Sequence, residues 1–283
     1  MVEQKGSLLN QLERDLPEGL VVDAAWLDAR GISRSLRSYY LQAGWLTQPV
    51  RGLYWRSRGP LKWQNVVVSM QTLLGMEFIV GGQTALDLQG YAHYLRTNQQ
   101  TVYLYGPNRP PGWLAKLPLS QRFLYRNSGV LFANDPIHLG LTSRALNTKT
   151  AEARDVTSFR GGDVTTLDWG PWDMPLTLSS PERAFLELLD ELPGEESFDQ
   201  ADMLMQGAAN LSPRKLQKLL QDCRSVKVKR LFLFFADRHK HAWRKRLDLS
   251  TIDLGSGKRM LVKGGRLDPT YHITVPEEFY GTE

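Results

Sequence analysis

The spacing of apolar and polar side chains predicts an amphipathic helix from Arg34 to Ala43. Ser33 precedes this segment as a candidate N-cap, and Gly44 follows it where a left-handed residue commonly ends a helix. At 100° per residue the apolar side chains gather on one face and the polar ones on the other. The first face is Leu36, Tyr39, Tyr40 and Ala43, and the second is Arg34, Arg37, Ser38 and Gln42.

A short hairpin is expected directly after this helix. Strand-forming residues at 45–46 and 53–55 flank a turn at 49–52, with Arg51 at its tip and Arg56 at its exit. Two further helices are predicted earlier, at 7–16 and, after the candidate cap Asp23, up to Ala29. Helix, helix, recognition helix and wing together predict a winged helix-turn-helix domain over residues 1–58.

The remaining chain, residues 59–283, is predicted to form a larger mixed α/β domain, so the fold class is α/β (α+β). Its α/β part covers about 63–176, where strands expected at 77–80, 101–105 and 122–126 alternate with short helices. From Ser180-Pro181-Glu182, a helix-start signal, a mainly helical part covers about 177–283. The chain is expected to close with strands at 252–254 and 259–262 around a Gly255–Gly257 turn.

The charges change the interpretation of the N-terminal domain. The chain has 35 basic and 30 acidic residues, a net charge of +5. Between Arg30 and Gly75 there are seven basic residues and no acid, whereas a solvated helix face usually mixes signs. Arginine and serine on one helix face, with arginine on a hairpin, suit phosphate contacts and base edges in a major groove. The alternative is a packing unit whose arginines are simply hydrated.

A second basic region lies between Arg214 and Arg246, with twelve Lys or Arg residues against two Asp residues. Three interpretations remain open: a solvated face, a second nucleic-acid contact, or a dock for a protein partner. The candidate partner-binding residues are Lys227, Lys229, Arg230, Arg238, Lys240 and Arg244.

Catalytic and metal-binding patterns are missing from the sequence. His93, His138 and His272 are isolated, and the lone Cys223 excludes an internal disulfide. The acids at 182–202 are expected on the outer faces of helices, which argues against a nuclease, and Gly81-Gly82 is better explained by tight packing than by phosphate binding. We expect no enzyme activity, no cofactor and no metal. No apolar run reaches the length of a membrane span and no signal peptide is visible, so a cytoplasmic protein without membrane contact is expected.

Three segments of the chain resemble those of the AbiEi antitoxins of type IV, abortive-infection toxin-antitoxin systems. The first is the short winged helix ending Gly44-Trp45-Leu46-Thr47 and Arg51-Gly52-Leu53-Tyr54. The others are Val80-Gly81-Gly82-Gln83-Thr84-Ala85-Leu86 and Ser180-Pro181-Glu182-Arg183-Ala184. Their order and spacing cover nearly the whole chain.

The resemblance implies a repressor of its own operon, which also neutralises a nucleotidyltransferase-like toxin from the adjacent gene through the C-terminal domain. It places Ser33, Arg34, Arg37, Ser38, Arg51 and Arg56 on the DNA-reading element. The expected partners are therefore double-stranded operator DNA and the cognate toxin. Pairing of monomers on inverted repeats, and the way the toxin is silenced, stay open. The alternative is a standalone DNA-binding regulator whose second domain senses another ligand or partner.

Overall fold

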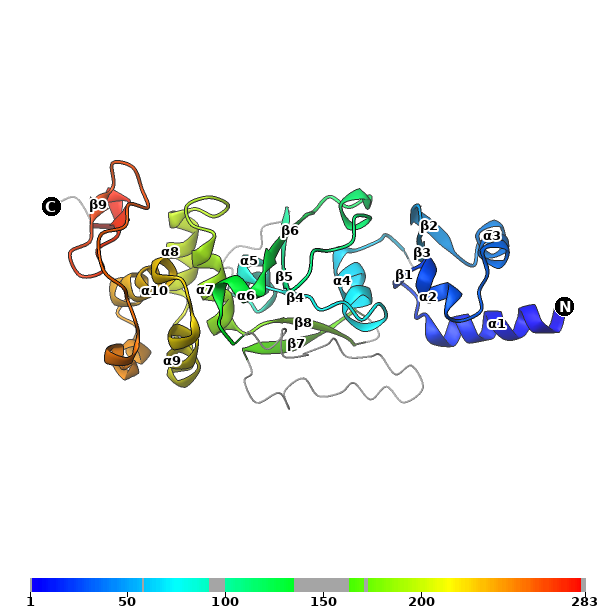
Figure 1. Ribbon diagram of the computed structural model, residues 1–283, viewed down its shortest axis with the longest axis horizontal. Helices are drawn as coiled ribbons and strands as arrows, with labels where there is room; N and C mark the ends of the chain where they lie inside the picture. The colour runs from blue at the N-terminus through cyan, green and yellow to red at the C-terminus, as the bar shows by residue number, and fades with distance from the viewer. Residues whose placement is uncertain (1, 58, 92–99, 135–162, 171–172, 281–283) are drawn as a thin grey trace.

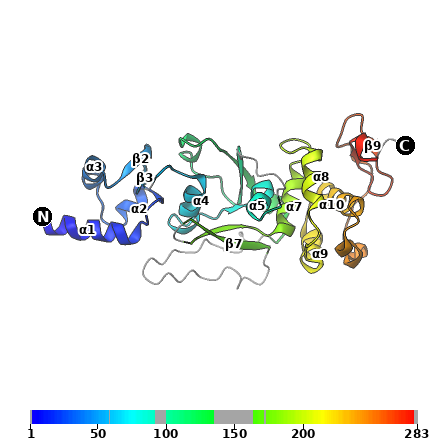
Figure 2. The ribbon, with the colours of Figure 1, turned by 180° about the vertical axis from the view of Figure 1, so that it is seen from behind.

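The computed structural model describes residues 2–57, 59–91, 100–134, 163–170 and 173–280. The chain is elongated: a small N-terminal unit, a central sheet with helices, and a helical C-terminal part follow one another along its long axis (Figure 1). The opposite view shows the same order, with the two ends of the chain at opposite ends of the molecule (Figure 2). The predicted α/β class is confirmed.

The N-terminal unit consists of α1 (Val2–Asp15), β1 (Val21–Asp23), α2 (Ala24–Asp28), α3 (Arg34–Gln42), β2 (Thr47–Val50) and β3 (Leu53–Trp55). Both helices of the helix-turn-helix start where the sequence places a cap. The Asp23 carboxylate accepts a hydrogen bond from the Trp26 amide, and the Ser33 hydroxyl accepts one from the Leu36 amide. Leu12, Leu16, Leu27 and Ile32 lie in the core beneath them.

The wing differs from the prediction in its first strand. The hairpin turns at Arg51-Gly52, with Gly52 at a φ of +86°, and Val50 pairs with Leu53. The first strand therefore covers 47–50 rather than 45–46 and includes Pro49. Proline is tolerated there because β2 is an edge strand of a sheet ordered β1-β3-β2.

The central part contains α4 (Trp63–Thr72) and a five-stranded sheet. The sheet order is β6-β5-β4-β8-β7, in which β4 pairs in parallel with β8, β5 pairs in parallel with β6, and the other two pairs are antiparallel. The strands are β4 (Ile79–Val80), β5 (Thr101–Gly106), β6 (Arg122–Asn127), β7 (Val164–Trp169) and β8 (Met174–Ser179). Between them lie α5 (Gly82–Leu88), the 3-10 helix η1 (Leu114–Lys116) and α6 (Ser128–Leu131).

The buried strand β8 was not predicted, although it lies between β4 and β7. The segment 155–172, for which the sequence predicts a strand and a loop, contains β7, and its residues 155–162 and 171–172 lie outside the described residues.

The C-terminal part is helical, as predicted. It comprises α7 (Pro181–Asp190), α8 (Phe198–Gln206), α9 (Pro213–Asp222) and α10 (Val226–Arg238). Short 3-10 helices follow at 242–246 (η3) and 249–251 (η4), and the described chain ends with η5 (Glu277–Tyr280). The expected strands at 252–254 and 259–262 are wrong: the small terminal sheet joins β9 (Arg266–Leu267) to β10 (Thr274–Val275).

The N-terminal unit is attached to the central part through α4. The Ser69 hydroxyl accepts a hydrogen bond from the Val21 amide at 2.9 Å, and the Asn65 amide donates one to the Gly19 carbonyl at 3.1 Å. Leu16, Leu20 and Val66 belong to one continuous apolar core that spans this junction. The predicted domain boundary falls on Arg58, which lies outside the described residues.

Candidate nucleic-acid interface

One face of α3 packs into the N-terminal unit and the other faces solvent. Leu36, Arg37 and Tyr40 are buried, which places the inward direction along that edge of the helix. At 100° per residue, the opposite face carries a continuous stripe of exposed side chains. The exposed stripe is Arg34, Ser35, Ser38, Tyr39 and Gln42.

The expected orientation of this helix is therefore corrected for three residues. Arg37 was placed on the outer face and Tyr39 and Ala43 on the inner face, but Arg37 is 7% exposed, Tyr39 is 49% exposed, and Ala43 is exposed. The exposed face of α3 is therefore turned toward Ser35 and Tyr39, compared with the predicted one. Neither residue was in the predicted DNA-binding set, and the exposed side chain of Trp45, 46% accessible, was also missed.

Arg37 joins α2 to α3 from inside the unit. Its Nη1 donates to the carboxylate of Asp28 and to the carbonyls of Ala24 and Ile32, the last at 3.1 Å. Its guanidinium also lies 5.7 Å from the centre of the Tyr54 ring. A guanidinium with these partners fixes the angle between the two helices, so we remove Arg37 from the proposed DNA contacts.

Arg56 likewise serves the fold. Its guanidinium donates to the carbonyls of Glu13 and Leu16, both at 3.0 Å, and to the carboxylate of Glu18 at 3.3 Å. These acceptors lie at the C-terminal end of α1 and just beyond it, where helix carbonyls lack intrahelical donors. Arg56 thus closes the wing onto α1, and it too leaves the proposed set.

The other four predicted residues lie on the outside. Ser33 caps α3, Arg34 and Ser38 lie on its exposed stripe, and Arg51 is exposed at the tip of the wing. Within the described chain no ion pair engages Arg34 or Arg51. The structure therefore brings Arg34 and Ser38 together on one helix, with Arg51 on the neighbouring hairpin (Figure 1).

The predicted partner-binding residues near the C-terminus are mostly occupied within the chain. Lys227 donates to the carbonyls of Asp190 and Leu192, and Arg230 is buried among carbonyl oxygens. Arg238 and Arg244 form ion pairs with Asp202 and Asp237.

The last two of the six candidates differ in exposure. Lys229 is 4% exposed, whereas Lys240 is exposed. Seven other exposed cations between residues 214 and 263 form no ion pair or side-chain hydrogen bond with the residues that the structure describes: Arg214, Lys218, Lys245, Arg246, Lys258, Arg259 and Lys263.

Two family models match the chain. One, described as the N-terminal domain of AbiEi antitoxin transcriptional regulators, matches residues 5–97. The other, described as a transcriptional regulator, AbiEi antitoxin, of type IV toxin-antitoxin systems, matches residues 162–276. The chain belongs to the AbiEi antitoxin family. The resemblance seen in the sequence is thereby confirmed.

Among solved structures, the chain is similar to the crystal structure of the RV2827C protein from Mycobacterium tuberculosis. The identity is 18%, the TM-score is 0.53, and the match covers 95% of this chain and 90% of that one. At this identity the similarity concerns the fold alone. No curated protein matches the chain.

The two family-like segments of this AbiEi chain outside the winged helix meet in its core. The Gly82 amide donates to the carboxylate of Glu187 at 2.9 Å, and that carboxylate also accepts from Ser179 and Arg183. A Cβ on Gly81 would overlap Glu187 Oε2 and the Tyr105 ring. The glycine pair therefore serves close packing, as the sequence suggested, and burial raises the pKa of Glu187 despite its hydrogen bonds.

The prediction that the acids at 182–202 line outer helix faces is wrong for four of them. Glu182, Glu187, Glu191 and Glu196 are all buried. Glu191 accepts two hydrogen bonds from Arg126, at 2.7 and 2.6 Å, and Glu196 accepts one from Tyr103 at 2.6 Å. Burial and this hydrogen bond raise the pKa of Tyr103. Glu187, Glu191 and Glu196 connect the helical part to strands of the sheet, whereas Glu182 accepts a hydrogen bond from the Ser212 amide at the start of α9.

No cluster of three or more potential metal ligands occurs within the described ranges. None of the described helices is both long and apolar enough to cross a membrane.

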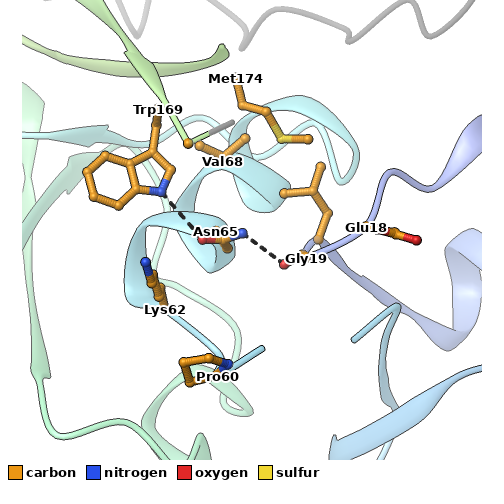
Figure 3. Close-up of a pocket in the computed structure, with 10 residues that line it drawn as sticks. Glu18, Gly19, Pro60, Lys62, Asn65, Val68, Trp169 and Met174 are labelled. Atoms are coloured by element: carbon orange, nitrogen blue, oxygen red, sulfur yellow. Dashed lines mark hydrogen bonds between the residues drawn. The ribbon is translucent and has the colours of Figure 1, made fainter. Parts of the chain in front are cut away.

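A pocket lies at the junction of the N-terminal unit and the central part (Figure 3). Its volume is about 220 Å³, and Leu20, Lys62, Asn65, Trp169 and Met174 contribute to its wall. Asn65 spans it, since its amide donates to Gly19 and its oxygen accepts from the Trp169 indole at 3.4 Å.

Proposed function

We propose that this AbiEi chain binds operator DNA through α3 and the wing, represses its own operon, and neutralises a nucleotidyltransferase-like toxin. The observation that carries the DNA-binding part is the exposed stripe on α3. It combines a cation, hydroxyls and an amide on a helix whose base is fixed by Arg37. Those groups are the donors and acceptors that read base edges in a major groove.

In this proposal the stripe and the wing have different tasks. Ser38 and Gln42 contact base edges, and Arg34 contacts either a base or a phosphate. Arg51, carried by a tight turn beside β3, contacts the backbone and positions the helix. The family description supports DNA binding by the N-terminal unit, because a transcriptional regulator acts on DNA.

Binding of the operon's own promoter fragment to the purified chain tests the proposal. We expect Ser38→Ala and Gln42→Ala each to weaken specific binding by about 1–3 kcal/mol and to leave nonspecific binding unchanged. Arg51→Ala should weaken both and lower the salt slope by about 1. Arg259→Ala, an exposed arginine at the far end of the chain, is the matched control. Unchanged affinity in all three variants would contradict the assignment.

The toxin-neutralising part is tested in cells that express the adjacent gene. The full chain should restore growth, and so should a variant with Arg34, Ser38 and Gln42 all changed to alanine. That triple variant should no longer repress the promoter. If the neighbouring product is harmless, or if the chain gives no protection, the antitoxin assignment is wrong.

The junction pocket favours a second candidate function. A ligand held between Lys62, Asn65 and Trp169 would contact both the DNA-binding unit and the central part, as a standalone ligand-sensing regulator requires. In that case Trp169→Ala would abolish the response of repression to the ligand but leave operator affinity of the free protein intact. A neighbouring gene unrelated to nucleotidyltransferases would favour this candidate.

A further inference from the structure

An exposed aromatic ring lies in the middle of the polar stripe on α3. Tyr39 is 49% exposed, and Ser35 and Gln42, about one helical turn before and after it, share its face. The core of the N-terminal unit is contacted from the other side of the helix, by Leu36 and Tyr40. Packing within the unit therefore does not explain a large ring at this position.

The Tyr39 ring is braced by its neighbour on the helix. The ring centres of Tyr39 and Tyr40 lie 6.0 Å apart with an angle of 51° between the planes, and Tyr40 is only 1% exposed. Because the buried ring is fixed by the core, its contact with Tyr39 restricts the exposed one. A side chain restricted in this way loses little conformational entropy when it meets a partner.

A DNA duplex is the occupant that the surroundings of Tyr39 favour. Residues 31–56 include no acid, and Arg34 on the same face and Arg51 on the wing form no ion pair within the described chain. The hydroxyls and the amide beside the ring need hydrogen-bond partners, which base edges supply and an apolar protein surface does not. Figure 1 and Figure 2 both show α3 at the end of the molecule remote from the central sheet, where a duplex can approach it.

The major groove offers one kind of apolar group to such a ring. Its base edges present hydrogen-bond donors and acceptors, and the C5-methyl group of thymine is the apolar exception. The groove is about 12 Å wide and admits a single α-helix, so side chains in the middle of the inserted face meet base edges. Tyr39 has this central position, between Ser35 and Gln42.

We infer that Tyr39 is a specificity-determining residue of the operator contact and that its ring packs against the methyl group of a thymine. This inference rests on the proposed DNA-binding function and adds a particular base to it. Ser38 and Gln42 supply the polar contacts of the stripe, and Tyr39 selects thymine over cytosine at one position of the site. The contact is made by the ring, so the phenol hydroxyl is not needed for it.

Promoter duplexes synthesised with deoxyuridine in place of thymidine test the inference. Uracil keeps the O4 acceptor and the pairing edge of thymine and lacks only the C5-methyl group. In titrations at fixed salt, this replacement should weaken binding of the wild-type chain by about fourfold more than binding of Tyr39→Ala. That factor is the effect expected when one methyl group loses an apolar contact. Tyr39→Phe keeps the ring and should respond to uracil as the wild type does.

Trp45→Ala is the matched control. Trp45 is a second exposed aromatic side chain of the N-terminal unit, 46% accessible, but it follows the Gly44 turn beyond the end of α3. Its removal should leave the uracil effect at the wild-type size, whatever the change in overall affinity. Loss of the effect in Trp45→Ala as well would show that weaker binding alone abolishes it, and the assignment of Tyr39 would be wrong.

The outcomes separate the inference from the function on which it rests. If the wild-type chain does not prefer its promoter to a random duplex, the proposed DNA binding is wrong and the inference falls with it. If the wild type binds its promoter and Tyr39→Ala shows the full uracil effect, only the role of Tyr39 is overturned.

The rival occupant of the exposed ring is a second copy of the chain. Sedimentation velocity of the DNA-free proteins covers this case, and we expect wild type and Tyr39→Ala to sediment alike. If Tyr39→Ala dissociated an oligomer that the wild type forms, the ring would belong to an interface between copies and the inference would be overturned.

Discussion

The two ends of the molecule are both rich in arginine and lysine, yet they use these residues differently. In the N-terminal unit three arginines form ion pairs: Arg30 with Asp15, Arg37 with Asp28, and Arg56 with Glu18. At the C-terminal end, the buried Arg230 contacts carbonyl oxygens, and the cations around it stay exposed. The N-terminal end therefore presents a polar reading surface with few charges, and the C-terminal end presents a concentrated positive charge.

This difference shows that a run of basic residues in the sequence does not reveal which of them lack an acidic partner in the fold. The segment from Arg30 to Gly75 has no acid, but Arg30, Arg37 and Arg56 pair with acids that precede it in the chain. A charge count along the sequence gives the number of cations in a segment. Only the packing shows which of these cations pair with acids of the same chain and which stay exposed for a binding partner.

The largest effect that tests this contrast is expected from Arg230→Ala. It would remove the guanidinium that donates to the carbonyls at the base of the 255–265 loop, those of Leu254, Gly255, Gly257 and His272. We expect a loss of roughly 3–5 kcal/mol in the free energy of unfolding, measured by urea denaturation. Lys258→Ala, on the same loop but exposed, should change stability by less than about 0.5 kcal/mol. A mild effect of Arg230→Ala would mean that the loop does not depend on this residue.

The next test compares two arginines of α3. Arg37→Ala removes the link between α2 and α3, so we expect a cost of roughly 2–4 kcal/mol in stability. Arg34→Ala, three positions earlier but on the exposed stripe, should leave stability nearly unchanged and weaken operator binding. Urea denaturation and promoter binding on the same two proteins separate the roles. The reverse result, with Arg37 affecting only DNA binding, would restore the orientation expected from the sequence.

The smallest effect concerns the pH dependence of stability near α9. Burial raises the pKa of Asp163 to about 6, although Arg183, Lys218 and Lys215 oppose the shift. Because the folded-state pKa exceeds the unfolded value, the stability that this carboxyl contributes is present in its protonated form and is lost as pH rises from about 4 through 6.

Asp163→Asn removes this titration, so its stability relative to the wild type should increase between pH 4.5 and pH 8. Paired urea denaturation curves at the two pH values measure the difference. A relative stability that decreases over the same interval would mean that the cations, rather than burial, control this carboxyl.

Local signals in the sequence predicted much of the fold. Helix starts at Ser33 and Ser180 were correct because a hydroxyl that caps a helix acts on amides only a few residues away. Strand β8 was missed because Pro175 and the short buried run that contains it give no clear alternation, and only its neighbours β4 and β7 define it as a central strand.

The site was predictable to the same extent. The position of the reading helix and of Arg51 followed from local pattern, whereas the rotation of α3 about its axis did not. That rotation depends on Arg37 reaching Ala24 and Asp28, which requires the packing of a second helix. The conformation of the 255–265 loop depends on Arg230, 25 residues before Gly255, and on Thr274, 13 residues after Leu261.

Asn65 has a consequence for how the chain can move. One amide group holds the loop before β1 on one side and the Trp169 indole of the sheet on the other. Because Gly19 belongs to the N-terminal unit and Trp169 to the central part, a rotation of one relative to the other strains or breaks a hydrogen bond of Asn65. The orientation of the N-terminal unit therefore depends on a side chain outside it, and in the proposed complex with DNA this residue would help to set how α3 meets the duplex without touching it.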